Sequence, residues 1–220
     1  MMLAGVGSAD ITPPVGVALQ GHWSPRPESR GVLRPLEVRT IALRSDRNTL
    51  VLVTADLISV PLDFTRRVRE AVAVRHGLPA QCVTIAASHT HCGPAMLRNL
   101  GLEPDPAVLE QVERGMVASI DEALSRLEPV TVGLGAASAH FNINRRPLPG
   151  MTAMAVNDAG IVDRRVRVLR IDRADGTPLA ILFHYSCHPT TKSGSDGLIS
   201  SDYPGVARAC IERELNTCAI

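Results

Sequence analysis

Aromatic residues make up only 3% of this 220-residue sequence, and neither sign of charge dominates it. The 23 lysines and arginines nearly balance the 22 aspartates and glutamates, which leaves a formal net charge of +1. Proteins that bind nucleic acids need basic patches, and those that bind single strands also need aromatic side chains for base stacking. The composition therefore argues against a nucleic-acid partner.

Long apolar runs and paired cysteines are missing as well. No run of about 18 apolar residues occurs, so the sequence predicts no transmembrane segment. The first residues lack the basic start and the long apolar core of a signal peptide, which favours a cytoplasmic location. The five cysteines form neither a C-x-x-C zinc pattern nor a disulfide framework, so we expect reduced thiols.

The apolar residues that are present, 45% of the chain, suffice for a sizeable core. Apolar and alternating runs predict strands over residues 6–11, 37–45, 49–60, 83–91, 130–139, 162–171 and 178–187. Helical periodicity predicts helices from an Asp63 cap to His76, from the Asp105 cap through Leu127, and from Tyr203 to Leu215. This succession predicts an α/β fold with a mixed β-sheet covered by helices.

Asp56 interrupts the apolar strand over residues 49–60 near its end. A carboxylate in such a strand is usually a hydrogen-bonded structural group, and a direct chemical role is the alternative.

Two histidines end the strand over residues 83–91, where Cys92-Gly93-Pro94 stops it. Since side chains alternate along a strand, His89 and His91 are expected on one side, about 6–7 Å apart. His188 follows a second apolar strand, and ligands of α/β proteins bind at such strand ends. Histidine is a common zinc ligand, so His89 and His188 are candidate metal ligands.

Two further residues could act beside that metal. His91 could be another ligand or could donate a hydrogen bond to a developing oxyanion. Arg145, in a polar segment between strands, could supply a fixed positive charge to the same anion. The Gln20–Trp23 segment, which holds the only tryptophan, either lines a pocket or forms a solvated loop.

A thiol-based site is an alternative. Cys92 adjoins His91 and Cys187 adjoins His188, and a cysteine with a lowered pKa is a good nucleophile. Adjacent residues on a strand face opposite sides, however, and free cysteines are usually buried apolar side chains. We therefore favour the metal site.

A set of motifs recurs in a fixed order along the chain. It comprises Gly5–Pro13, Arg34–Leu43, the strand that ends at Asp56, S-H-T-H-x-x-P (Ser88–Pro94), N-I-N-R-x-P (Asn142–Pro147), C-H-P-T (Cys187–Thr190) and S-S-D-x-x-G (Ser200–Gly205). In this order the motifs resemble the amino-terminal catalytic domain of the neutral/alkaline non-lysosomal ceramidases, over essentially the whole chain.

The resemblance implies a zinc-dependent amidase that hydrolyses the N-acyl bond of ceramide to sphingosine and a fatty acid. Metal-bound water, with its pKa lowered toward neutrality, would attack the carbonyl. By position, His89 and His188 match zinc ligands of the family. His91 and Arg145 match residues that surround the scissile amide and its oxyanion.

The chain departs from the family in length. Members are much longer, and their remaining zinc ligands, a glutamate and a tyrosine, lie beyond the point where this sequence stops. We therefore expect residues 1–220 to form the N-terminal part of a single ceramidase-like zinc hydrolase domain, without a C-terminal immunoglobulin-like domain. Two histidines alone would bind zinc weakly or not at all.

The substrate implied by the resemblance is a lipid amide. The low aromatic content and the apparent lack of a secretion signal separate this sequence from secreted, lipid-handling members, so hydrolysis of a non-lipid, small-molecule amide is one alternative. A non-catalytic fragment that keeps the fold but lacks the complete site is another.

Overall fold

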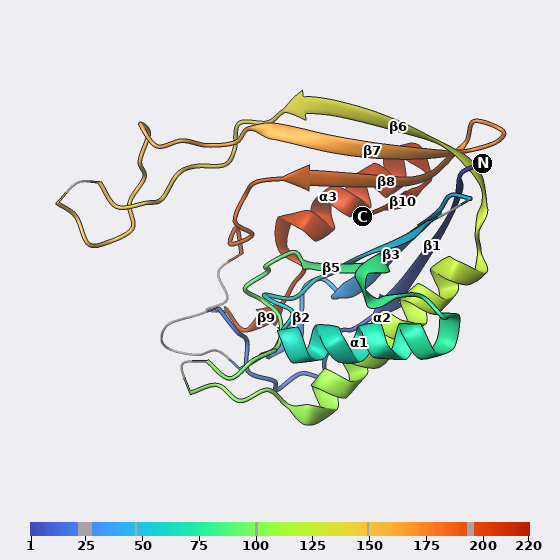
Figure 1. Ribbon diagram of the computed structural model, residues 1–220. Helices are drawn as coiled ribbons and strands as arrows, with labels where there is room; N and C mark the ends of the chain where they lie inside the picture. The colour runs from blue at the N-terminus through green and yellow to red at the C-terminus, as the bar shows by residue number, and fades with distance from the viewer. Residues whose placement is uncertain (22–27, 47, 100, 149, 193–195) are drawn as a thin grey trace.

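A computed structural model describes residues 1–21, 28–46, 48–99, 101–148, 150–192 and 196–220 (Figure 1). In these ranges, one sheet contains β1 (Leu3–Asp10), β3 (Glu37–Arg44), β4 (Thr49–Ala55), β5 (Val83–Ala87), β6 (Glu128–Ser138), β7 (Arg165–Arg173), β8 (Pro178–Tyr185) and β10 (Cys218–Ala219). The strand order is β10-β8-β7-β6-β1-β3-β4-β5. Because β4–β5 and β8–β10 pair in parallel and the other pairs are antiparallel, the expected mixed sheet is confirmed.

The helices follow the sequence pattern closely. They are α1 (Leu62–His76), α2 (Pro106–Ser125) and α3 (Asp202–Leu215), with a short 3-10 helix at Ala80–Cys82. The Asp105 side chain caps α2 as expected, since it accepts a hydrogen bond from the backbone N–H of Ala107 at 2.8 Å. The expected Asp63 cap is wrong: Pro61 occupies the N-cap position, and Asp63 lies within the first turn of α1.

Strands β4, β5 and β8 end earlier than expected from the sequence. Strand β5 pairs only with β4, in a register that runs from Val51↔Val83 to Ala55↔Ala87. Because β4 ends at Ala55, no strand of the described residues pairs with the chain beyond Ala87. The expectation that His89 and His91 lie on the strand is therefore wrong, and both residues belong to the following loop.

Helix α2 packs closely on β1 because that strand presents glycines to it. A Cβ atom at Gly7 would lie 2.1 Å from the carbonyl oxygen of Ser119, a distance that no side chain permits. On the neighbouring strand, the Thr40 hydroxyl contacts the Ser119 hydroxyl at 2.6 Å inside the core. Buried apolar residues of β3, β4, α1 and α2 fill the space between these helices and the sheet.

Helix α3 lies on the other side of β3, between β3 and β8 in Figure 1. Arg39 of β3 pairs with Glu212 of α3 at 2.7 Å. Arg208 of α3 donates to the buried carboxylate of Asp56, with an Nη1–Oδ1 distance of 3.0 Å. The structural role expected for Asp56 is therefore confirmed. None of the described helices is long and apolar enough to cross a membrane.

Short pairings that the sequence does not indicate complete the fold. Strands β2 (Gly31–Val32) and β9 (Leu198–Ile199) pair in parallel near the loops that follow β5 and β8. Two-residue strands such as these, and β10, carry no periodic signal. The β2–β9 pair joins the N-terminal loop to the start of α3.

Candidate metal centre

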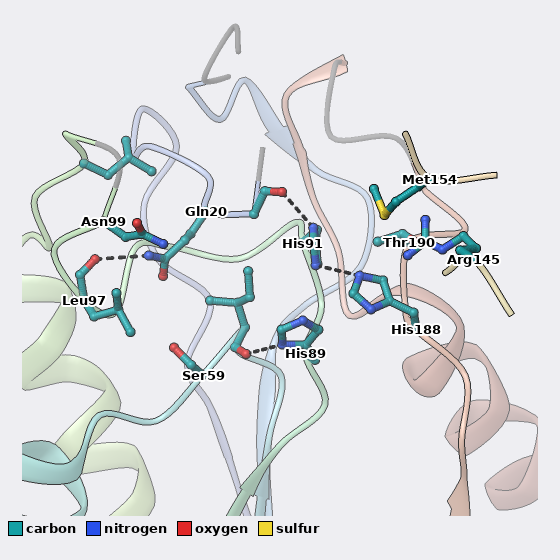
Figure 2. A pocket seen from close by; sticks show the side chains of 13 residues that line it. Gln20, Ser59, His89, His91, Leu97, Asn99, Arg145, Met154, His188 and Thr190 are labelled. Atoms are coloured by element: carbon teal, nitrogen blue, oxygen red, sulfur yellow. Dashed lines mark hydrogen bonds between the residues drawn. The ribbon is translucent and has the colours of Figure 1, made fainter. Parts of the chain in front are cut away.

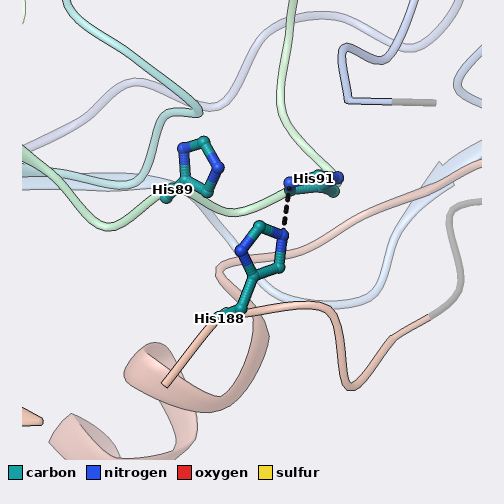
Figure 3. Close-up of side chains that lie close together, drawn as sticks. All are labelled: His89, His91 and His188. Carbon is teal, nitrogen blue, oxygen red and sulfur yellow. Dashed lines mark hydrogen bonds between the residues drawn. The ribbon is translucent and has the colours of Figure 1, made fainter. Parts of the chain in front are cut away.

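His89, His91 and His188 gather at one point beyond the ends of β5 and β8 (Figure 3). Their ring centroids lie between 4.7 and 5.1 Å apart. One nitrogen atom from each ring lies within 4.8 Å of the others, which is close enough for all three to bind a single metal ion. The convergence expected for His89 and His188 is present in the structure, and His91 joins it.

The backbone beyond β4 orients His89. The backbone N–H of His89 donates to the carbonyl of Leu57 at 2.9 Å, and ring Nδ1 lies 2.6 Å from the carbonyl oxygen of Ile58. A carbonyl oxygen only accepts, so Nδ1 carries the proton and the neutral ring presents an unprotonated Nε2. His89 has a φ of 69°, a left-handed conformation that is strained outside glycine.

His91 is oriented in the same way by the N-terminal loop. Its Nδ1 lies 2.9 Å from the carbonyl oxygen of Gly21, so Nδ1 donates here as well. Gly21 has a φ of 111°, and a Cβ atom there would lie 2.5 Å from Nδ1 of His91. Only glycine brings the carbonyl this close to the ring.

The spacing of the rings fits a bound metal. The Nε2 atoms of His91 and His188 lie 3.0 Å apart in a hydrogen bond, in which the unprotonated Nε2 of His91 accepts from His188. Two nitrogen ligands at 2.0–2.1 Å from a tetrahedral zinc ion are separated by about 3.3 Å. With two of the three rings held in the tautomer that exposes Nε2, the residues present suit zinc.

The charge state of His188 also suits metal binding. Partial burial lowers its pKa, and the positive charge of Arg145 and the neighbouring His89 lower it further. A lowered pKa keeps the imidazole neutral, which is the form that binds a metal.

A pocket of about 600 Å³ opens in front of the three rings, as Figure 2 shows. Arg145 lines it beside His188, so the structure brings together all four residues that the sequence singled out. Gln20 and Gly21 line the pocket, which confirms that part of the expected lining, while His22 and Trp23 lie outside the described residues.

The remaining lining residues were not anticipated. The apolar ones are Ile58, Leu97, Leu102 and Met154, and the polar ones are Ser59, Asn99 and Thr190. Most of them come from the loops that carry His91, Arg145 and His188, but nothing in the sequence marks these particular side chains as pocket residues. The carbonyl oxygen of Ile58 is the extreme case, because every residue type carries one.

The thiol-based alternative is not supported. Burial, together with the nearby Asp202 and Asp196 carboxylates, raises the pKa of Cys92 to about 11. Burial also raises the pKa of Cys187. Both thiols therefore remain protonated near neutral pH and are poor nucleophiles.

The mixed sheet and the three converging imidazoles together define an α/β domain with a candidate metal site. Residues 2–219 match the family model described as "Neutral/alkaline non-lysosomal ceramidase, N-terminal". The chain belongs to this family, so the resemblance inferred from its motifs is confirmed.

Relatives in the family are longer. Neutral ceramidase from Drosophila melanogaster is 26% identical over 226 residues, and neutral ceramidase B from Dictyostelium discoideum is 25% identical over 228 residues. Each alignment covers 96% of this chain and 32% of the relative. The chain therefore spans about a third of the length of these relatives.

The fold is also that of a solved ceramidase. The structure of neutral ceramidase from Pseudomonas aeruginosa matches 99% of this chain and 37% of its own, with a TM-score of 0.86 at 23% sequence identity. This likeness confirms the α/β fold expected from the sequence.

Proposed function

We propose that this chain forms the metal-holding part of a zinc-dependent amide hydrolase that acts on ceramide, releasing sphingosine and a fatty acid. The observation that carries the proposal is the convergence of His89, His91 and His188 on one pocket that Arg145 also lines. Membership of the ceramidase family supports the reaction type.

The four side chains have different roles in the proposed reaction. His89 and His188 would hold the zinc ion, which when bound would act as a Lewis acid that activates water and polarises a carbonyl group. His91 either completes the ligand set or donates a hydrogen bond to the oxygen of the scissile amide. Arg145 places a fixed positive charge where negative charge develops on that oxygen.

The pocket wall supports a substrate with an apolar part. Ile58, Leu97, Leu102 and Met154 offer side chains without polar hydrogen-bonding groups next to the imidazoles. An acyl chain or a sphingoid chain would bury apolar surface against them, while the amide faces the histidines.

The test compares substrates and metal content. The purified chain, alone and co-expressed with the remaining two thirds of the Drosophila relative, is stripped with a chelator and reloaded with zinc. Fatty acid release is then measured from an N-acylsphingosine and from a water-soluble N-acyl amino acid. His188→Ala removes a proposed ligand, and His184→Ala is the matched control because His184 is an exposed residue of β8.

We expect zinc-dependent release from N-acylsphingosine that His188→Ala abolishes and His184→Ala retains. Release from the soluble amide alone would assign a non-lipid substrate. Zinc binding without hydrolysis in either arm would instead support a non-catalytic role, and activity that survives both chelation and His188→Ala would contradict the metal-dependent chemistry.

A further inference from the structure

The segment Ser200–Tyr203, where β9 leads into α3, contacts both loops that carry the histidines. It contains the S-S-D part of the S-S-D-x-x-G motif, to which the proposed chemistry gives no role. Ser200, Ser201 and Asp202 are all buried.

One set of contacts fixes the loop that carries His89 and His91. The Thr90 hydroxyl donates to the carbonyl of Ser200 at 2.7 Å, and Thr90 is fully buried between the two histidines in sequence. The backbone N–H of Ser200 donates to the carbonyl of Cys92 at 3.0 Å. The histidine loop is thus hydrogen-bonded to the segment on both sides of His91.

A second set of contacts fixes the loop that carries His188. One carboxylate oxygen of Asp202 accepts from the Thr191 hydroxyl at 2.7 Å, and the other accepts from the backbone N–H of Lys192 at 2.9 Å. The Tyr203 hydroxyl donates to the carbonyl of Cys187 at 3.0 Å. These bonds lie before and after His188 in the chain.

Helix capping does not account for this arrangement. The N-cap of α3 is Ser201, and its side chain makes no capping hydrogen bond. The Asp202 carboxylate accepts from the N–H of Tyr203, but three other donors come from Thr191 and Lys192. Asp202 also has a φ of 54°, a left-handed conformation that a residue other than glycine adopts only when its surroundings hold it.

We infer that the Ser200–Tyr203 segment sets the distance between the two histidine loops, with Asp202 and Tyr203 as positioning residues for the metal site. The expected effect of this segment on zinc affinity rests on the proposed function. Its effect on the orientation of the histidine rings does not. Residues that orient metal ligands commonly change metal affinity by about 10–100-fold when they are replaced.

The experiment uses Asp202→Asn, which puts an amide N–H group against existing donors, and Tyr203→Phe, which removes only the hydroxyl. Asp105→Asn is the matched control, because Asp105 also begins a helix and accepts a backbone N–H. Far-UV circular dichroism checks folding. Histidine-ring NMR spectra of the metal-free protein report the tautomer of each imidazole, and competition with a chromophoric chelator gives the zinc affinity.

We expect the ring signals of His91 and His188 to change in Asp202→Asn and Tyr203→Phe and to stay at wild-type positions in Asp105→Asn. Zinc affinity should fall by about 10–100-fold in Asp202→Asn and by less in Tyr203→Phe. If Asp202→Asn does not fold, the comparison of Tyr203→Phe with wild type decides.

Folded variants with wild-type ring signals and wild-type zinc affinity would overturn the inference. If the wild-type chain binds no zinc but the ring signals move in the two variants, the positioning role stands and the proposed metal site falls. The two failures are therefore distinguishable.

Discussion

At His188, burial and the positive charge of Arg145 act on one imidazole and lower its pKa. Because the folded-state pKa lies below the ordinary value of about 6.5, the unfolded chain takes up a proton first as the pH falls. The contribution of this residue to stability is therefore complete above about pH 6.5 and is lost as the pH falls through the folded-state pKa. Acidification thus opposes both folding and metal binding at this residue.

Replacing Arg145 tests its share of this effect. Arg145→Gln should raise the pKa of His188 in the metal-free protein, since a repulsive positive charge is removed while the burial of His188 remains. NMR titration at low ionic strength, where screening is weak, measures the shift. Arg146→Gln is the control, because it removes the same charge from an exposed neighbour that does not line the pocket. Equal shifts in the two variants would contradict a specific effect of Arg145.

The candidate site could be anticipated at the level of residue type. Histidines at the ends of two apolar runs identified His89, His91 and His188, and a polar segment between strands suggested Arg145. The family resemblance then supported all four. The alternation argument gave the wrong reason for the meeting of His89 and His91, because both lie past the end of β5. The backbone carbonyl groups of Ile58 and Gly21 orient these rings instead. Every residue has such a group, so the sequence cannot show which ones bind a ring.

Between elements, the buried ion pair of Asp56 and Arg208 ties the end of β4 to α3. The Asp56 carboxylate also accepts the backbone N–H of Glu37 at 3.1 Å. Leu57 and Ile58, the next two residues, supply the carbonyl groups that hold His89. The pair therefore anchors the segment on which the orientation of His89 depends.

Asp56→Asn should lower the free energy of unfolding by about 3–5 kcal/mol, because it leaves the Arg208 charge buried without its main partner. Urea unfolding measures the change. Asp172→Asn breaks the surface pair with Arg170 and should cost less than about 1 kcal/mol. The double variant Asp56→Asn with Arg208→Met should recover part of the lost free energy of unfolding. Equal losses in Asp56→Asn and Asp172→Asn would refute the role of the buried charge.

Elements with strong local signals could be predicted from the sequence. Helix α2 combines the Asp105 cap, Pro106 in its first turn and a regular apolar stripe, and it forms as expected. Strand ends could not be predicted, because β5 stops where its partner β4 stops and not at the Cys92-Gly93-Pro94 break. Pairing with a distant strand also creates β10, for which two residues carry no pattern.

On the scale of the whole molecule, the site is made by loops from distant parts of the chain. The N-terminal loop supplies Gly21, and the loop after β4 supplies Ile58. The loop after β5 supplies two histidines, the segment between β6 and β7 supplies Arg145, and the loop after β8 supplies His188. The order of the motifs along the sequence indicated a family in which these parts form one site. The contacts through Ser200–Tyr203 appear only in the three-dimensional structure. The chain spans about a third of the length of its curated relatives.

Locating bound zinc tests the central claim most directly. Crystals of the chain grown with zinc are measured at the zinc absorption edge, and an anomalous difference map locates the ion. We predict one peak about 2.0–2.1 Å from Nε2 of His89 and from a ring nitrogen of His188. Zinc bound elsewhere, or the two rings turned apart with no peak between them, would contradict the account.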